Sequence, residues 1–223
     1  MQQFLRLLVL VPFLAERAAA AQCPDVETFR STNITDGSFD PKKLDGLWYE
    51  LAYHDPAQIG STCQTLNSTL DTATGKLVMP FSVKYGPVPF TIVEEYSPTS
   101  EVGVYSKIAL PPISAKALGR SASALAQSRL GGRTAAGDTL TLPTVFVDVT
   151  TTAPSSSATE YETMTLYSCV QVDDDHIATE LVFASRDKDA TDETLDAMEA
   201  VARAQGVEWD DADLVRSTCS NWN

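Results

Sequence analysis

Four cysteines and two histidines are the residues of this chain best suited to chemistry. A cysteine thiolate can attack carbon or bind a metal, and a histidine exchanges protons near neutral pH. The cysteines are even in number, lie far apart and form no C-x-x-C pair, which favours disulfides over a zinc or redox site. They are Cys23, Cys63, Cys169 and Cys219. Spacing alone leaves every pairing among them open.

The two histidines give little indication of a catalytic or metal site. His54 and His176 lie near a predicted strand end and a predicted turn, and local spacing provides no serine or cysteine partner for either. The run from Asp173 to His176 has the residue types that bind a cation, but acidic runs at hairpin tips are usually solvated. We therefore expect no catalytic residue, no metal and no cofactor.

The composition is that of an acidic globular chain. Its 223 residues are 43% apolar, enough for one domain with a sizeable core, and the formal net charge is −14. So strong a negative charge repels phosphate backbones and anionic lipid headgroups. Nucleic acid and acidic membranes are therefore not expected as partners.

The first residues are typical of a targeting segment. Residues 1–21 combine a basic residue, a short apolar run and small residues before a cleavage point, and the run is too short to span a bilayer. N-glycosylation sequons follow at Asn33 and Asn67. We therefore expect a signal peptide, no integral membrane span and a secreted glycoprotein of residues 22–223. An organelle lumen is the alternative destination.

The mature chain is dominated by short segments in which apolar and polar residues alternate, the pattern of half-buried strands. They span residues 47–54, 63–71, 76–85, 89–96, 101–110, 144–151, 161–172 and 177–186. Short connections favour an antiparallel meander, and closure into an eight-stranded up-and-down β-barrel removes both sheet edges. The predicted fold class is therefore all-β, with one C-terminal α-helix capped by Thr191, carrying a narrow apolar stripe, and ending at Gly206.

Residues 111–143 do not fit the meander. This segment between strands five and six begins with two prolines, contains helix-favouring alanine and leucine, and is locally basic. One interpretation is a solvated insertion. The other is a cover at the barrel mouth that meets a ligand carboxylate, a receptor or an acidic partner.

Three motifs, in order along the chain, resemble the signature of the lipocalin family: a glycine-x-tryptophan pair, a threonine-acid-tyrosine run and an arginine after the last strand. The residues are Gly46, Trp48, Thr159, Glu160, Tyr161 and Arg186. With the cysteine after Tyr167-Ser168 and a final cysteine, they are most similar to the branch containing apolipoprotein D and plasma retinol-binding protein. Glu160 departs from the usual aspartate, and the long insertion is unusual for that branch.

The resemblance implies specific contacts. Trp48 would close one end of the barrel, Arg186 would lie across its indole ring, and Gly46 would let the backbone turn into the first strand. It also implies two disulfides, which are Cys23–Cys169 and Cys63–Cys219.

The function implied by the resemblance lies in the barrel cavity, because fold alone does not define function. Alternation predicts an inner wall with few polar groups. Its residues are Leu77, Met79, Phe81, Val83, Phe90, Ile92, Val102, Val104, Ile108, Val145 and Val147. Such a wall suits a retinoid, fatty acid, sterol or carotenoid-like molecule. We therefore expect a carrier that is not an enzyme.

Two other functions remain open at this stage. The chain would be a lipid-modifying isomerase or de-epoxidase if a buried carboxylate protonates the bound molecule. It would be a protein-interaction module if the basic insertion at residues 111–143 is the functional surface.

Overall fold

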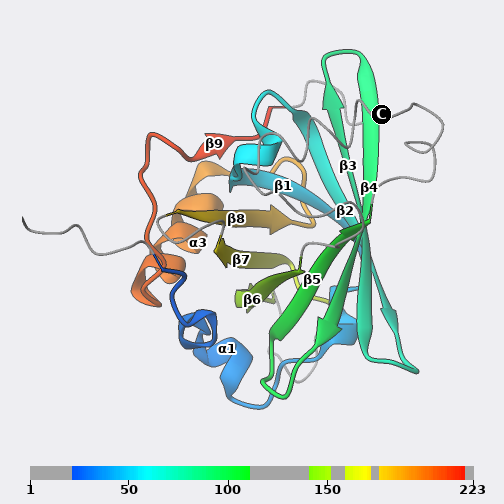
Figure 1. The fold of residues 1–223 in the computed structure, drawn as a ribbon, viewed down its shortest axis with the longest axis vertical. Helices are drawn as coiled ribbons and strands as arrows, with labels where there is room; N and C mark the ends of the chain where they lie inside the picture. Colours follow the sequence, from blue (N-terminus) through cyan, green and yellow to red (C-terminus); the bar gives the residue numbers. More distant parts are fainter. Residues whose placement is uncertain (1–21, 111–140, 152–158, 172–175, 219–223) are drawn as a thin grey trace, which may run out of the picture.

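The computed structural model describes residues 22–110, 141–151, 159–171 and 176–218. Its long strands form one sheet (Figure 1), and they are β1 (Gly46–His54), β2 (Thr62–Asp71), β3 (Lys76–Tyr85), β4 (Val88–Pro98), β5 (Val104–Leu110), β6 (Thr141–Thr150), β7 (Thr163–Gln171) and β8 (Ile177–Ser185). The other described elements are the 3-10 helices η1 (Val26–Phe29), η2 (Pro41–Leu44) and η3 (Pro56–Gln58), the helices α1 (Thr32–Thr35) and α3 (Asp192–Ala204), and the short strand β9 (Val215–Arg216).

The sheet closes on itself through β1. Each long strand pairs antiparallel with the next along the chain, and β1 also pairs with β8. The first half of β1 faces β2, whereas Ala52 and Tyr53 in its second half pair with β9. The predicted fold class, an eight-stranded antiparallel barrel followed by a helix, is confirmed.

The predicted strand boundaries hold closely except at β5, which begins at Val104 instead of residue 101, and at β6. This strand begins at Thr141, and Ser106 of β5 is paired with Pro143. The last three residues of the predicted insertion are therefore part of the barrel wall. Residues 111–140, which make up the rest of that insertion, lie outside the described residues.

Two bulges decide which side chains face the barrel interior. The register of β1 against β8 shifts between Glu50 and Ala52, and that of β6 against β7 shifts between Phe146 and Asp148. A bulge inserts one residue into a strand and so reverses the side on which the following residues lie. As a result Ala52 packs outside the barrel, although it is only two residues from Glu50.

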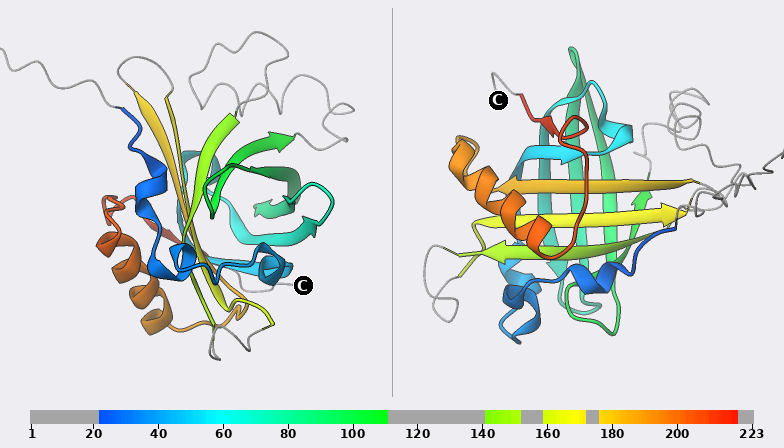
Figure 2. Two further views of the ribbon diagram at one scale, coloured as in Figure 1. Left: turned by 90° about the horizontal axis from the view of Figure 1, so that it is seen from below. Right: turned by 90° about the vertical axis from the view of Figure 1, so that its left-hand side faces the viewer.

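Both faces of part of the sheet are buried. An inner cluster lies inside the barrel and includes Trp48, Met79 and Phe146. An outer cluster packs β6, β7 and β8 against α3 and the N-terminal segment, which Figure 2 shows lying across these strands. Because the outer face of β6 is covered, this strand is apolar on both sides instead of alternating.

The helix α3 has the predicted limits. The Thr191 hydroxyl accepts a hydrogen bond from the Thr194 amide at 3.4 Å, which caps the first turn. Leu195, Met198 and Ala202 are buried against the outer cluster. Gly206 follows the helix with a φ of +89°, a conformation that favours glycine. Among the described residues, no helix has the length and apolar character needed to cross a membrane.

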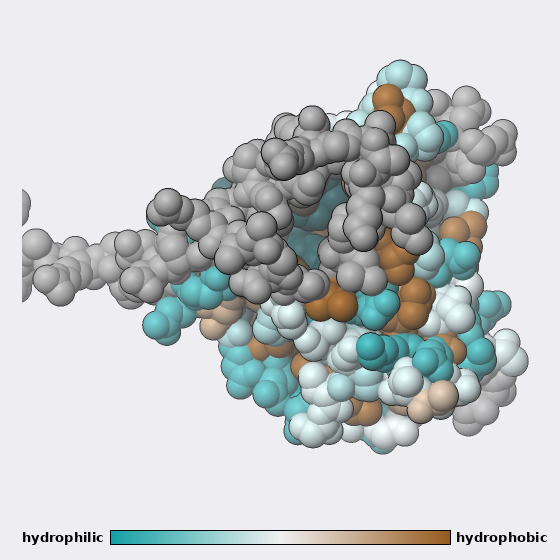
Figure 3. Space-filling view, turned by 45° about the vertical axis from the view of Figure 1, so that its right-hand side comes forward, coloured by the Kyte–Doolittle hydropathy of each residue, from teal (hydrophilic) through white to brown (hydrophobic). Residues whose placement is uncertain are grey.

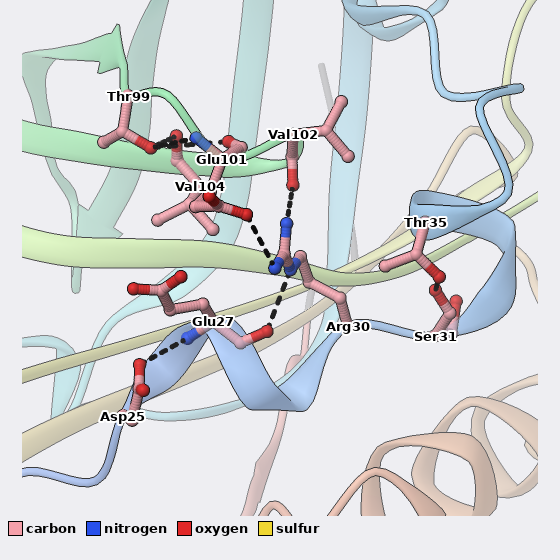
Figure 4. A network of polar contacts seen from close by, with 9 residues as sticks. All are labelled: Asp25, Glu27, Arg30, Ser31, Thr35, Thr99, Glu101, Val102 and Val104. Carbon is pink, nitrogen blue, oxygen red and sulfur yellow. Dashed lines mark hydrogen bonds and ion pairs between the residues drawn. The ribbon is translucent and has the colours of Figure 1, made fainter.

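The N-terminal segment is tied to the barrel at several points. The predicted disulfide Cys23–Cys169 joins it to β7. Farther along, the Arg30 guanidinium donates to the Val102 carbonyl at 2.7 Å and forms an ion pair with Glu101 at 3.2 Å (Figure 4). These contacts fix η1 and α1 against the turn between β4 and β5.

The second predicted disulfide is not tested. No described cysteine is free, but Cys219, the expected partner of Cys63, lies outside the described residues. Cys63 itself has a φ of +57° at the point where the register of β2 against β3 is irregular.

The closed end of the barrel has the predicted plug. The Arg186 guanidinium lies 3.7 Å from the centroid of the Trp48 ring and donates to the carbonyls of Lys43, Asp45, Leu47 and Tyr161. Gly46 has a φ of +104°, and a Cβ there would lie 3.0 Å from Arg186 Nη1. The glycine is therefore required both by backbone conformation and by the close approach of the arginine.

Candidate functional site

The apolar wall predicted for β3 and β4 lies on the inner face. Leu77, Met79, Phe81 and Val83 are buried in the inner cluster, with Phe90 and Ile92 partly buried against it. Phe81 pairs with Ile92 and Val83 pairs with Phe90, so these side chains share one face of the hairpin. They form a continuous apolar surface inside the barrel.

The wall predicted for β5 and β6 was assigned to the wrong face. Val104, Val145 and Val147 belong to the outer cluster under α3, and Val102 is 45% exposed in the turn before β5. Ile108 is only partly buried and pairs with Glu95, which forms an ion pair with Lys76 outside the inner cluster.

The physical reason is that the outer face of these strands is also covered. Apolar residues on β5 and β6 therefore do not identify the interior. Their inner face instead carries Tyr105 and Phe146, together with one charged side chain, that of Lys107.

Lys107 lies at the centre of a buried charged layer. Its ammonium forms ion pairs with Glu94 of β4, at 3.5 Å, and with Glu180 of β8. The side chain of Lys107 is only 4% exposed, and that of Glu94 is 8% exposed. Since β5 and β8 are not neighbours in the sheet, the pair with Glu180 connects two sides of the barrel through its interior. The predicted lining with few polar groups is therefore wrong at this level.

The charges in this layer shift one another's protonation. Desolvation lowers the pKa of Lys107, but the carboxylates of Glu180 and Glu94 outweigh it, so the net pKa is raised. Burial raises the pKa of Glu94, and Lys107 opposes that shift. The Tyr96 hydroxyl donates to Glu94 Oε2 at 2.6 Å, and burial together with that carboxylate raises the Tyr96 pKa well above its usual value. Lys107 therefore stays an ammonium and is not an amine nucleophile.

Two further carboxyl groups come from the middle of β1 and from the residue that follows the strand. Glu50 is 1% exposed, and burial, followed by the charges of Glu180 and Glu94, raises its pKa well above the usual range. Asp55 caps η3 by accepting a hydrogen bond from the Ala57 amide at 2.7 Å, and burial raises its pKa to about 7. Near neutral pH this layer therefore holds protons that carboxyl groups in water would release.

Unpaired polar atoms accompany these groups. Among the described residues, Glu50 Oε2 and Gln58 Oε1 are buried without a hydrogen-bond partner. A buried polar atom without a partner costs on the order of 1–3 kcal/mol, so such atoms often mark a place where another molecule binds. In Figure 3, hydrophilic residues are seen at depth on one face of the molecule, with hydrophobic residues beside them.

The charged layer was missed in the sequence, although one signal for it was present. Extending the inward positions Phe90 and Ile92 by the same alternation places Glu94 and Tyr96 on the inner face. The other members had no comparable signal. Glu50 lies just before the bulge in β1. Lys107 lies on β5, whose apolar residues were predicted to face the interior and instead face outward.

The other predicted motif residues lie away from this layer. Thr159 and Glu160 are exposed, whereas the Tyr161 hydroxyl accepts a hydrogen bond from the Asp40 amide at 2.8 Å near the plug. The predicted glycosylation residues, Asn33 and Asn67, are both exposed. Asp173 to Asp175 lie outside the described residues.

The histidines also lie apart from the charged layer. His54 Nε2 is 3.1 Å from the Thr179 hydroxyl, and His176 is exposed. Within the part of the chain that the structure describes, no group of three or more histidine, cysteine, aspartate or glutamate side chains is arranged to hold a metal ion.

Comparison with solved structures identifies the fold. No family model matches the sequence, and no curated protein matches it. Among solved structures, lobster apocrustacyanin A1 has a TM-score of 0.59 at 14% identity, with 91% of each chain covered. Insecticyanin from the tobacco hornworm Manduca sexta has a TM-score of 0.53 at 12% identity, with 82% of each chain covered. The chain therefore has the lipocalin fold, as the motifs predicted.

Proposed function

We propose that this protein is a lipocalin that binds and carries a small, largely hydrophobic molecule inside its barrel. The observation that supports this most is the apolar inner wall of β3 and β4, from Met79 to Val83 and from Phe90 to Ile92, above a floor of buried polar groups. An apolar wall with a few convergent polar groups is the usual composition of a small-molecule site. The shared fold is consistent with this function but does not establish it.

Several finer points of this proposal rest on the sequence alone. These are the signal peptide, secretion, glycosylation at Asn33 and Asn67, and placement beside apolipoprotein D and retinol-binding protein. A receptor or acidic partner at residues 111–143 is also a prediction from the sequence.

The experiment uses a charge placed on the inner wall. Ile92 is a better position than Met79, because Met79 is fully buried and pairs directly with Glu94. We expect Ile92→Asp to fold and to weaken binding of a fluorescent fatty alcohol by at least about tenfold, since a carboxylate in an apolar site loses its hydration.

The matched control is Thr91→Asp. Thr91 is exposed, and its hydroxyl lies 2.9 Å from that of Ser82 on the outer face. This variant should bind like the wild type. Equal loss in both variants, or no binding of any lipid to the folded wild type, would contradict the carrier function.

A lipid-modifying enzyme is the second candidate, and the raised pKa of Glu50 favours it. A carboxyl group that keeps its proton near neutral pH can act as a general acid toward a bound epoxide or polyene. Mass spectrometry of lipid extracted after incubation separates the two functions. Recovery of the unchanged compound supports carriage, and a transformed compound whose formation stops in Glu50→Gln supports catalysis.

A further inference from the structure

Two of the four carboxyl groups of the charged layer form no ion pair within the described residues. Lys107 pairs with Glu94 and Glu180. Glu50 and Asp55 form no ion pair with any lysine, arginine or histidine in the described ranges. The charged layer therefore has one cation for four acids, so a charge on Glu50 or Asp55 has no ion-pair partner there.

The unpaired atoms of the layer are hydrogen-bond acceptors. Gln58 Oε1 can only accept, and so can Glu50 Oε2 when the carboxyl group is ionised. Glu50 and Gln58 are 1% and 3% exposed, respectively. They also lie close together, since the Gln58 side chain hydrogen-bonds to Glu50. When Glu50 is ionised, the missing partner is therefore a group that donates hydrogen bonds to two adjacent acceptors.

The groups around Glu50 reinforce this requirement. Glu180, Glu94 and Asp55 each place negative charge near it, from β8, β4 and the end of β1, whereas Lys107 is already engaged by two of them. The Tyr53 hydroxyl already donates to the backbone carbonyl of Gln58 at 3.3 Å. Burial raises the Tyr53 pKa, and the charge of Glu50 adds to this shift. With Glu50 ionised, no described side chain donates a hydrogen bond to Glu50 Oε2 or Gln58 Oε1.

We propose that Glu50 and Gln58 form a subsite for the protonated amino group of a hydrophobic amine whose hydrocarbon part lies against the β3 and β4 wall. An ammonium donates three hydrogen bonds and accepts none, so it pairs both orphan oxygens and supplies the missing positive charge. This inference rests on the proposed carrier function and names the class of ligand.

The charges and hydrogen-bond acceptors of the subsite also predict how tightly ligands with other head groups bind. A carboxylate brings a further negative charge into a layer that already holds four acids, so fatty acids and retinoic acids are poor ligands. A ketone offers only an acceptor and leaves Gln58 Oε1 unpaired. An alcohol donates a single hydrogen bond and brings no charge, which places it between the amine and the acid.

Proton release provides a readout independent of affinity. In the free protein, burial and the surrounding acids raise the pKa of Glu50, which favours its protonated form. An ammonium beside it favours the carboxylate, so binding of the amine should release protons to the buffer. Binding of an alcohol should release none.

The experiment compares octylamine, octan-1-ol and octanoate, which share one chain length, by titration calorimetry at pH 7 in buffers of different ionisation enthalpy. We expect octylamine to bind at least about tenfold more tightly than octanol, and octanoate to bind most weakly. Glu50→Gln should reduce octylamine affinity by at least about tenfold and abolish proton release, with octanol affinity nearly unchanged.

The control for attraction to the acidic surface is Glu95→Gln. This residue follows Glu94 on β4 but pairs with Lys76 at 3.6 Å outside the inner cluster. It should leave all three affinities unchanged. If octanol binds as tightly as octylamine, or if the preference for the amine survives in Glu50→Gln, the subsite is wrong while the carrier function stands. If none of the three compounds binds, both fail.

Discussion

Two layers of the barrel interior, one next to the other along β1, balance their charges differently. In the plug, Arg186 lies on Trp48, and within the described part of the chain its guanidinium donates to backbone carbonyls. Two residues farther along, Glu50 is buried with an oxygen that has no described partner. A charge satisfied by the chain stabilises the fold, whereas one left unsatisfied lowers stability and is available to a ligand.

The comparison predicts that the plug contributes most to stability. Trp48→Ala should lower the free energy of unfolding by about 3–5 kcal/mol, because it leaves a cavity and removes the surface on which Arg186 lies. Urea unfolding followed by circular dichroism measures this. A loss below about 1 kcal/mol would mean that the barrel end is held by other contacts.

The charged layer should depend on pH in a way that the plug does not. Lys107→Met should cost about 3 kcal/mol at pH 8, since it leaves Glu94 and Glu180 buried without a cation. At pH 5 the cost should be smaller. Glu94 has a raised pKa in the folded state, so as the pH falls it gains a proton there before it does in the unfolded chain, and its part of the penalty decreases.

The control is Lys76→Met. Lys76 pairs with Glu95 and its side chain is 41% exposed, so this pair should contribute less than about 1 kcal/mol at either pH. Equal losses for the two lysine variants would contradict the claim that the inner layer differs from the barrel surface.

The plug was predicted through the resemblance to lipocalins, because Gly46, Trp48 and Arg186 stand in the motif positions of that family. Gly46 and Trp48 begin a strand, Arg186 ends one, and a motif fixes their relation. Thr191 likewise predicts its helix, because an N-cap depends only on the next few residues. The pairing of Cys23 with Cys169 followed from the family resemblance and not from spacing.

The charged layer was not predictable in the same way, for two physical reasons. First, β6 is buried on both faces, so Val145 and Val147 look like cavity residues although they pack under α3. Second, single-residue bulges in β1 and β6 reverse the alternation, and nothing in the local sequence locates them. A glutamate such as Glu50 in an alternating segment is therefore easily taken for a surface residue.

The most direct test of the account is the protonation of Glu50 itself, followed by carbon-13 NMR of its side-chain carboxyl carbon across a pH titration. The account predicts that Glu50 titrates well above its ordinary value of 4.5 in the free protein, and that its pKa falls when octylamine is added. Lys107 and the surrounding acids remain in place in this experiment, so it needs no substitution. A pKa near the ordinary value, unchanged by the amine, would contradict the claim that this layer is an unsatisfied site inside the barrel.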